Sequence, residues 1–240
     1  MENILSDGSI SRRTLLQGVG VGATLASVAT VAGAEPAATS TSHRPSPDAA
    51  LALLKKGNAD FLAGKPVPID TNGRRRLQIA KGQEPFAILV SCSDSRVPPE
   101  VLFGRGLGEL FIVRNAGNTV DTAAMGSIEY GVAELKVPLI VVMGHERCGA
   151  VAAALSVVEK NSVYPGSIGR MVEPIVPAVL QARAAGGDWL DASVRGNVMR
   201  TVARLRTASE PLLLDPVKAG KLKIVGAYYD LDDGRVTFFE

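Results

Sequence analysis

The chain has 240 residues, of which 46% are hydrophobic and 21% are charged. This composition can bury a hydrophobic core and excludes an intrinsically disordered chain. Lysine and arginine outnumber aspartate and glutamate by only 26 to 24. Because the basic residues are also scattered, the charge pattern argues against nucleic acid as a partner.

The first 34 residues have the pattern of an export signal. Arg12 and Arg13 precede an uncharged stretch, residues 18–34, that is rich in Gly, Ala, Ser and Thr. This resembles a twin-arginine signal peptide, so we expect the twin-arginine export machinery to carry the protein and cleavage to occur near Ala34-Glu35. The mature protein would be periplasmic or secreted. A membrane anchor is the alternative, but the stretch is shorter and less apolar than a typical span.

Residues 35–47 contain three prolines among many Ser, Thr and Ala residues, which is typical of a flexible linker. His43 lies in this stretch and is expected to be a solvated linker residue, not a metal ligand. Residues 48–240 then have the length of one α/β domain.

The first part of this domain alternates between helical and strand patterns. A helix is expected from Pro47 and Asp48 to Gly64, and a shorter one over residues 71–81. Three continuous apolar runs have the length of a strand, at residues 86–90, 110–113 and 137–142. Strands that are apolar on both faces are typical of a parallel sheet covered by helices.

The remaining elements complete an α/β pattern. Asp121 can cap a helix before the third strand, and another helix is expected to start at Cys148. Two more helical patterns cover residues 167–185, interrupted by two prolines, and 188–208. Residues 222–231 and 236–239 flank Asp233-Gly234, which predicts an antiparallel hairpin. The expected fold is a mixed sheet with a parallel central core flanked by helices, plus an antiparallel edge strand.

Three metal-binding side chains follow these strands. Cys92 comes directly after the first predicted strand, His145 after the third, and Cys148 three residues later at the expected start of a helix. Ligands in open α/β sheets bind at this carboxyl edge. Two thiolates and one imidazole are typical of zinc and leave a fourth position open. A disulfide between the cysteines and a purely structural zinc site, with Asp94 as the fourth ligand, are the alternatives.

Asp94 and Arg96 lie two and four residues after Cys92. A carboxylate near zinc can accept a hydrogen bond from the bound hydroxide, and an adjacent guanidinium keeps that carboxylate ionised and oriented. An ordinary ion pair in a turn is the alternative. The pair therefore gives a candidate catalytic dyad.

Four motifs carry a resemblance to the β-carbonic anhydrases. Residues 92–96 (CSDSR) and 144–149 (GHERCG) are similar to the two signature motifs of that family, and residues 114–118 (RNAGN) and 126–131 (GSIEYG) support the match. The resemblance implies a zinc lyase that reversibly hydrates carbon dioxide to bicarbonate and a proton through zinc-bound hydroxide.

The resemblance also implies roles for single residues. It implies one zinc ion per subunit on Cys92, His145 and Cys148, and catalysis by Asp94 with Arg96. It further implies that Gln83 hydrogen-bonds the substrate, that Phe111 and Ala116 form apolar walls, and that the protein is a homodimer or homotetramer. Two other functions stay open at this point: hydrolysis of carbon disulfide or carbonyl sulfide at the same site, and a non-catalytic periplasmic zinc-binding protein.

Overall fold

The structure is a computed structural model that describes residues 44–65, 68–184, 186–207 and 211–239. The expected signal peptide and most of the expected linker, including His43, lie outside the described residues. Among the described residues, no helix has both the length and the hydropathy that a membrane-spanning helix requires.

The described part of the chain forms a five-stranded sheet in the order β2-β1-β3-β4-β5. The first four strands in the chain run parallel to their neighbours, and β5 runs antiparallel to β4. This confirms the mixed sheet and its antiparallel edge strand. The strands are β1 (Ala87–Ser91), β2 (Leu110–Arg114), β3 (Leu139–His145), β4 (Lys223–Tyr229) and β5 (Val236–Phe239).

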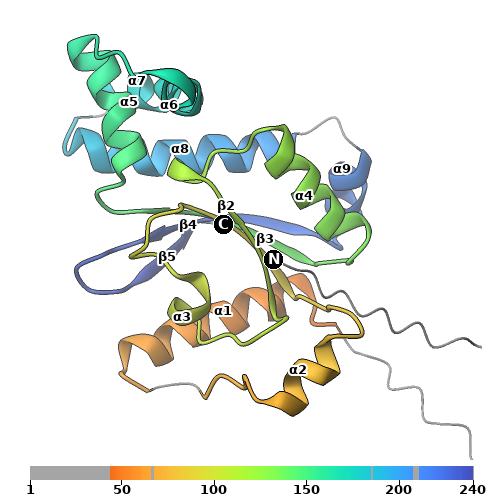
Figure 1. Cartoon of the computed structure of the whole chain (residues 1–240). Coiled ribbons are helices and arrows are strands. Elements are labelled where there is room, and N and C mark those ends of the chain that lie inside the picture. Colours follow the sequence, from red (N-terminus) through yellow and green to blue (C-terminus); the bar gives the residue numbers. More distant parts are fainter. Residues whose placement is uncertain (1–43, 66–67, 185, 208–210, 240) are drawn as a thin grey trace, which may run out of the picture. The chain divides into compact units, whose positions relative to one another are not determined.

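Helices cover both faces of the sheet (Figure 1). The first three helices, α1 to α3, lie on one side, whereas α4, α8 and α9 lie on the other together with α5, α6 and α7. The helices are α1 (Pro47–Leu62), α2 (Gly73–Ile79), α3 (Pro99–Leu102), α4 (Thr122–Ala133), α5 (Gly149–Lys160), α6 (Gly166–Val172), α7 (Val176–Arg183), α8 (Trp189–Arg206) and α9 (Pro211–Lys218), with two 3₁₀ turns, η1 (Ala116–Asn118) and η2 (Glu173–Ile175).

The two faces of the central strands build two separate cores. Leu89 of β1 packs in a cluster that includes Leu54 of α1, whereas the neighbouring Ile88 packs with Ile128 of α4 and Val198 of α8. All five side chains are fully buried. Burying an aliphatic side chain of this size contributes about 1.5–3 kcal/mol, so the continuous apolar runs in the sequence stabilise both layers.

Several expected boundaries are confirmed and others differ. Asp121 caps α4, accepting a hydrogen bond from the Ala124 N–H at 2.8 Å, which typically contributes about 1 kcal/mol. The helical pattern at residues 167–185 is split into α6, η2 and α7, because two prolines interrupt it. Neither α3 nor α9 was expected: α3 is only four residues long, and α9 contains Pro216.

Candidate metal centre and catalytic site

The carboxyl ends of β1 and β3 bring three candidate ligands together. Cys92 follows β1, His145 is the last residue of β3, and β1 and β3 are neighbours in the sheet. Cys148 is the N-cap residue of α5. One ligand atom from each of the three residues lies within 4.8 Å of the others, and all three residues are buried. The three side chains therefore form a group that can hold a metal ion.

His145 presents one ring nitrogen to this group. Its Nδ1 lies 2.8 Å from the Glu146 carbonyl oxygen. A carbonyl only accepts hydrogen bonds, so Nδ1 carries the proton and Nε2 keeps its lone pair. Among the described residues, His145 Nε2 is buried and has no hydrogen-bond partner. A buried polar atom without a partner is costly, and a metal ion between Nε2 and the two sulfurs would satisfy it.

The two cysteines are free and share one hydrogen bond. Their sulfurs lie 4.0 Å apart, well beyond the S–S bond length of about 2.05 Å, so the alternative of a disulfide is not realised in this structure. The hydrogen bond from Cys148, together with the one from the Gly117 N–H, lowers the pKa of Cys92 to about 4. The same bond and burial raise the pKa of Cys148. The pair thus already stabilises one thiolate, the form that binds metals.

Asp94 lies beside the ligands and is held by Arg96. The Arg96 side chain donates to both carboxylate oxygens, at 3.0 Å and 2.8 Å, and the Arg96 N–H donates to Oδ1 at 2.9 Å. Asp94 Oδ2 lies 3.8 Å from His145 Nε2. The hydrogen bonds from the Arg96 guanidinium hold the pKa of Asp94 well below its usual range. Asp94 is therefore an ionised, hydrogen-bond-accepting group next to the candidate metal position.

Arg114 fixes the loop that carries Cys92 and Asp94. This last residue of β2 donates from Nε to the Cys92 carbonyl at 2.8 Å and from its terminal nitrogen to the Asp94 carbonyl at 2.6 Å. From the sequence, Arg114 was identified only as part of the motif at residues 114–118. A basic residue at the carboxyl end of an otherwise apolar strand was the available signal for this role.

The structure brings one of the three expected substrate-binding residues to the cysteines. Ala116 lies in η1 and packs against the cluster that contains Cys92 and Cys148. Gln83 is exposed and precedes β1, so the strand, roughly 17 Å long for its five residues, separates it from Cys92. Phe111 lies on β2, where its ring centroid is 6.3 Å from that of Tyr130. Within one chain, Gln83 and Phe111 are thus not brought to the ligands.

The loop between His145 and Cys148 is tied to the β4–β5 hairpin. Arg147 has a left-handed backbone (φ 51°) and forms two hydrogen bonds with Asp232, at 2.9 Å and 2.5 Å. Glu146 accepts a hydrogen bond from the Leu231 N–H at 3.1 Å. Glu146, Asp230 and Asp232 lie close enough to hold a cation, but Arg147 already pairs with two of these carboxylates. The cluster therefore serves to fix the ligand loop.

A family comparison decides between the possible functions of this site. A family model described as "Carbonic anhydrase" matches residues 87–236, which include all three candidate ligands and Asp94. The chain belongs to the carbonic anhydrase family. The reaction of this family is the reversible hydration of carbon dioxide, and the chain is an enzyme of that reaction.

Individual relatives agree with this assignment. The carbonic anhydrase of Mycolicibacterium smegmatis is 45% identical over 190 residues, covering 79% of this chain and 92% of the relative. Carbonic anhydrase 2 of Mycobacterium tuberculosis is 43% identical over 191 residues, covering 80% and 92%. These names do not favour carbon disulfide or carbonyl sulfide as substrates, and they argue against a protein without turnover.

Solved structures assign the class. One of the two tetrameric β-carbonic anhydrases of Sordaria macrospora has a TM-score of 0.63 at 26% identity, covering 76% of this chain and 93% of the other. The Coccomyxa β-carbonic anhydrase in complex with acetazolamide has a TM-score of 0.59 at 28% identity, covering 78% and 83%. The enzyme is thus a β-carbonic anhydrase, as the sequence motifs predicted.

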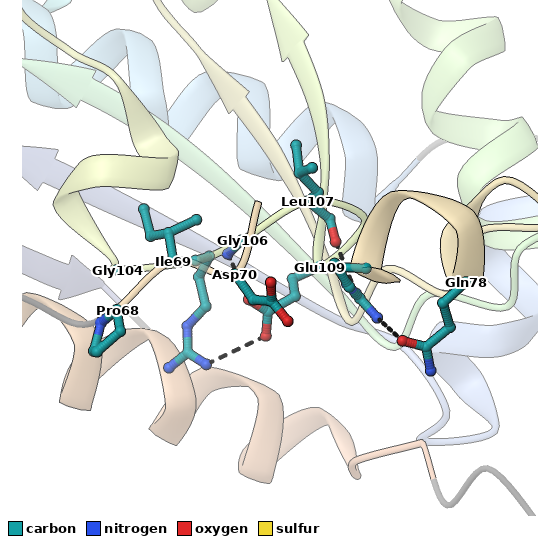
Figure 2. Close-up of a pocket in the computed structure, with 10 residues that line it drawn as sticks. Pro68, Ile69, Asp70, Gln78, Gly104, Gly106, Leu107 and Glu109 are labelled. Carbon is teal, nitrogen blue, oxygen red and sulfur yellow. Dashed lines mark hydrogen bonds and ion pairs between the residues drawn. The ribbon is translucent and has the colours of Figure 1, made fainter. Parts of the chain in front are cut away.

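Figure 2 shows a separate pocket of this carbonic anhydrase, whose lining residues include none of the three candidate ligands. It has a volume of about 450 Å³ and is lined by residues of α2 and of the segments before α2 and β2, among them Asp70, Arg75, Arg105 and Glu109. Because it adjoins the start of β2, it lies at the opposite edge of the parallel strands from Cys92. Arg105 lies 3.7 Å from Glu109, and Arg75 donates to the Leu107 carbonyl at 2.8 Å. The described residues that line this pocket include no cysteine or histidine, which distinguishes it from the metal centre.

Proposed function

We propose that this carbonic anhydrase holds one zinc ion per subunit on Cys92, His145 and Cys148, and that Asp94 and Arg96 are its catalytic residues. The observation that carries the proposal is the buried, unpartnered Nε2 of His145 facing two sulfurs that lie 4.0 Å apart. Zinc bound by this donor set supplies a Lewis acid that makes water nucleophilic near neutral pH.

The residues of the chain orient the reaction. Asp94 is ionised, so it accepts a hydrogen bond from the attacking water and leaves a lone pair of that water directed at the carbon of carbon dioxide. Arg96 holds both carboxylate oxygens in place. Ala116 contributes an apolar wall, which suits a small neutral substrate. The products are bicarbonate and a proton. The proton passes to buffer or to other polar groups, because His145, the single histidine among the described residues, would be a metal ligand.

We further propose that two copies of the chain share their sites. The outer edge of β2 pairs with no other strand in the described part of the chain, and exposed strand edges are ready to pair with another chain. Helix α2 has no buried residue, and Leu77 on it is 74% exposed. A second copy at this edge would cover α2 and bring its own Gln83 and Phe111 to a site they do not reach within one chain. The tetrameric Sordaria relatives support such an assembly.

We also propose export through the twin-arginine route, with cleavage near Ala34-Glu35 and a periplasmic or secreted mature enzyme. The support is the Arg12-Arg13 pair before an uncharged stretch that ends in small residues. Replacing both arginines by lysine in the full chain should leave the precursor uncleaved inside the cell. Unchanged cleavage and fractionation of that variant would reject this route.

The central experiment measures metal and turnover together on purified protein. The wild type should contain about one zinc per chain and hydrate carbon dioxide in a stopped-flow assay. Asp94→Asn should keep its zinc and lose most of its turnover, while Asp233→Asn, in the β4–β5 turn, serves as the control. A wild type without metal and with a Cys92–Cys148 disulfide would overturn the zinc proposal. Full activity of Asp94→Asn would overturn the catalytic role of Asp94.

Complementation tests the shared site. Gln83→Ala and Asp94→Asn should each be nearly inactive alone. Co-expressed in equal amounts, they should form mixed dimers with one intact site out of two, which restores about a quarter of the wild-type activity. No restoration in mixtures that light scattering shows to be dimeric would place Gln83 outside the partner's site.

A further inference from the structure

Helix α8 carries a buried amide that its packing does not explain. Most of its buried positions are apolar, and Asn197 lies among them with only 4% of its surface exposed. A buried polar side chain needs a hydrogen-bond partner to offset its desolvation. Asn197 finds one far away in the sequence: its Nδ2 donates to the Gly117 carbonyl at 2.9 Å.

Gly117 in turn touches a candidate metal ligand. Its N–H donates to Cys92 Sγ at 3.3 Å, so both of its backbone polar groups are engaged. Its backbone is left-handed (φ 71°), and a Cβ atom at this position would lie 2.7 Å from Ile175 Cδ1 and 3.0 Å from Ala150 Cβ. Glycine is thus required both for the conformation and for the space. The carbonyl that accepts from Asn197 and the N–H that donates to the sulfur lie in the two peptide planes that meet at Gly117 Cα. Holding the carbonyl therefore restricts how far the N–H can move relative to the sulfur.

We propose that Asn197 is a positioning residue for the Cys92 sulfur, acting through Gly117. This inference rests on the proposed role of Cys92 as a zinc ligand. A hydrogen bond to a thiolate withdraws electron density from sulfur and fixes its direction, so it tunes both how strongly the ligand binds and how it donates charge to the metal. Removal of such outer partners typically weakens metal binding about 10- to 100-fold.

The test compares two substitutions on the same helix. Asn197→Leu keeps nearly the same volume but removes the donor to Gly117. Thr201→Val, one turn further along, replaces a side chain that is also buried with one of similar size. The Thr201 hydroxyl donates to the Asn197 backbone carbonyl at 3.0 Å, so this control perturbs the helix without touching Gly117. Zinc affinity is measured by competition with a chromophoric chelator, and cobalt(II) replaces zinc for absorption spectra of the sulfur-to-cobalt charge-transfer band.

We expect Asn197→Leu to bind zinc about 10-fold more weakly and to move the charge-transfer band to longer wavelength, because sulfur without its hydrogen bond gives up electrons more readily. Thr201→Val should change neither quantity. Unchanged affinity and band position in Asn197→Leu would overturn the inference, as would equal changes in the control. If Asn197→Leu does not accumulate as soluble protein, Asn197→Ala gives the same readouts. A wild type that binds no metal would instead reject the proposed function.

Discussion

Replacing Arg96 by glutamine tests whether catalysis depends on the orientation of Asp94. In the structure, the Arg96 guanidinium donates to both Asp94 oxygens, at 3.0 Å and 2.8 Å, and a glutamine amide cannot reproduce this two-pronged geometry. The carboxylate then turns more freely next to His145. A misplacement of about 1 Å at a reacting group can lower a rate about 100-fold, so we expect a fall in kcat of about that size, with KM nearly unchanged.

Three measurements separate this effect from others. Stopped-flow hydration of carbon dioxide gives kcat and KM, metal analysis gives zinc content, and urea denaturation gives stability. Zinc content and the unfolding midpoint should stay at the wild-type values, because Arg96 does not contact the ligands and exposed ion pairs contribute little stability. Arg96→Lys keeps the charge without the fork and should be intermediate, roughly 10-fold slower than wild type. A glutamine variant within threefold of the wild-type kcat would refute the reasoning.

Three further predictions follow from packing and from the metal. Gly57→Ala should lower the free energy of unfolding by about 2 kcal/mol, because the new Cβ would lie 2.0 Å from the Phe103 carbonyl oxygen. Such overpacking costs about 3 kcal/mol, and the gain in helix propensity offsets about 1 kcal/mol of it. A rise in the melting temperature would contradict this prediction. Gly144→Ala should lower the free energy of unfolding by about 1–3 kcal/mol, because its Cβ would lie 2.7 Å from Val198 Cγ2. In urea titrations, adding Val198→Ala should recover part of that free energy. Strictly additive decreases in the two single variants and the double variant would exclude this clash. Removing the metal with a strong chelator should abolish the hydration of carbon dioxide and lower the melting temperature, and added zinc should restore both. A melting temperature that does not change with the chelator would show that metal binding does not stabilise the fold.

Local sequence patterns were sufficient for the main elements of this fold. Strands β1 and β3 are continuous apolar runs because both of their faces are buried, and β2 is a similar run that is only half-buried at the edge of the sheet. Asp121 marks the start of α4 because its side chain caps the helix. The ligands could also be placed from the sequence: Cys92 follows β1 and His145 ends β3, and because these strands are parallel the two residues meet at one edge. Helix α9 was missed because Pro216 lies inside it, and proline disfavours a helix interior.

Long-range contacts could not be read from these patterns. The bond from Asn197 to Gly117 joins residues 80 positions apart, and nothing local to either residue indicates the other. The available signal was an amide on the buried stripe of a helix, between Val194 and Val198. The role of Gln83 came from the family resemblance alone, and the predicted strand at residues 86–90 separates this residue from Cys92 in the sequence.

The order of strands in the sheet has a consequence for assembly. Cys92 follows β1 and His145 ends β3. The two cysteines are 56 residues apart in the chain, so no short peptide contains all three ligands. A nascent polypeptide therefore has no complete set of metal ligands until β1 and β3 have paired and α5 has packed against its neighbouring helices. We therefore expect the metal to bind late in folding, so that a metal-bound subunit is one in which the central strands of the sheet have already paired.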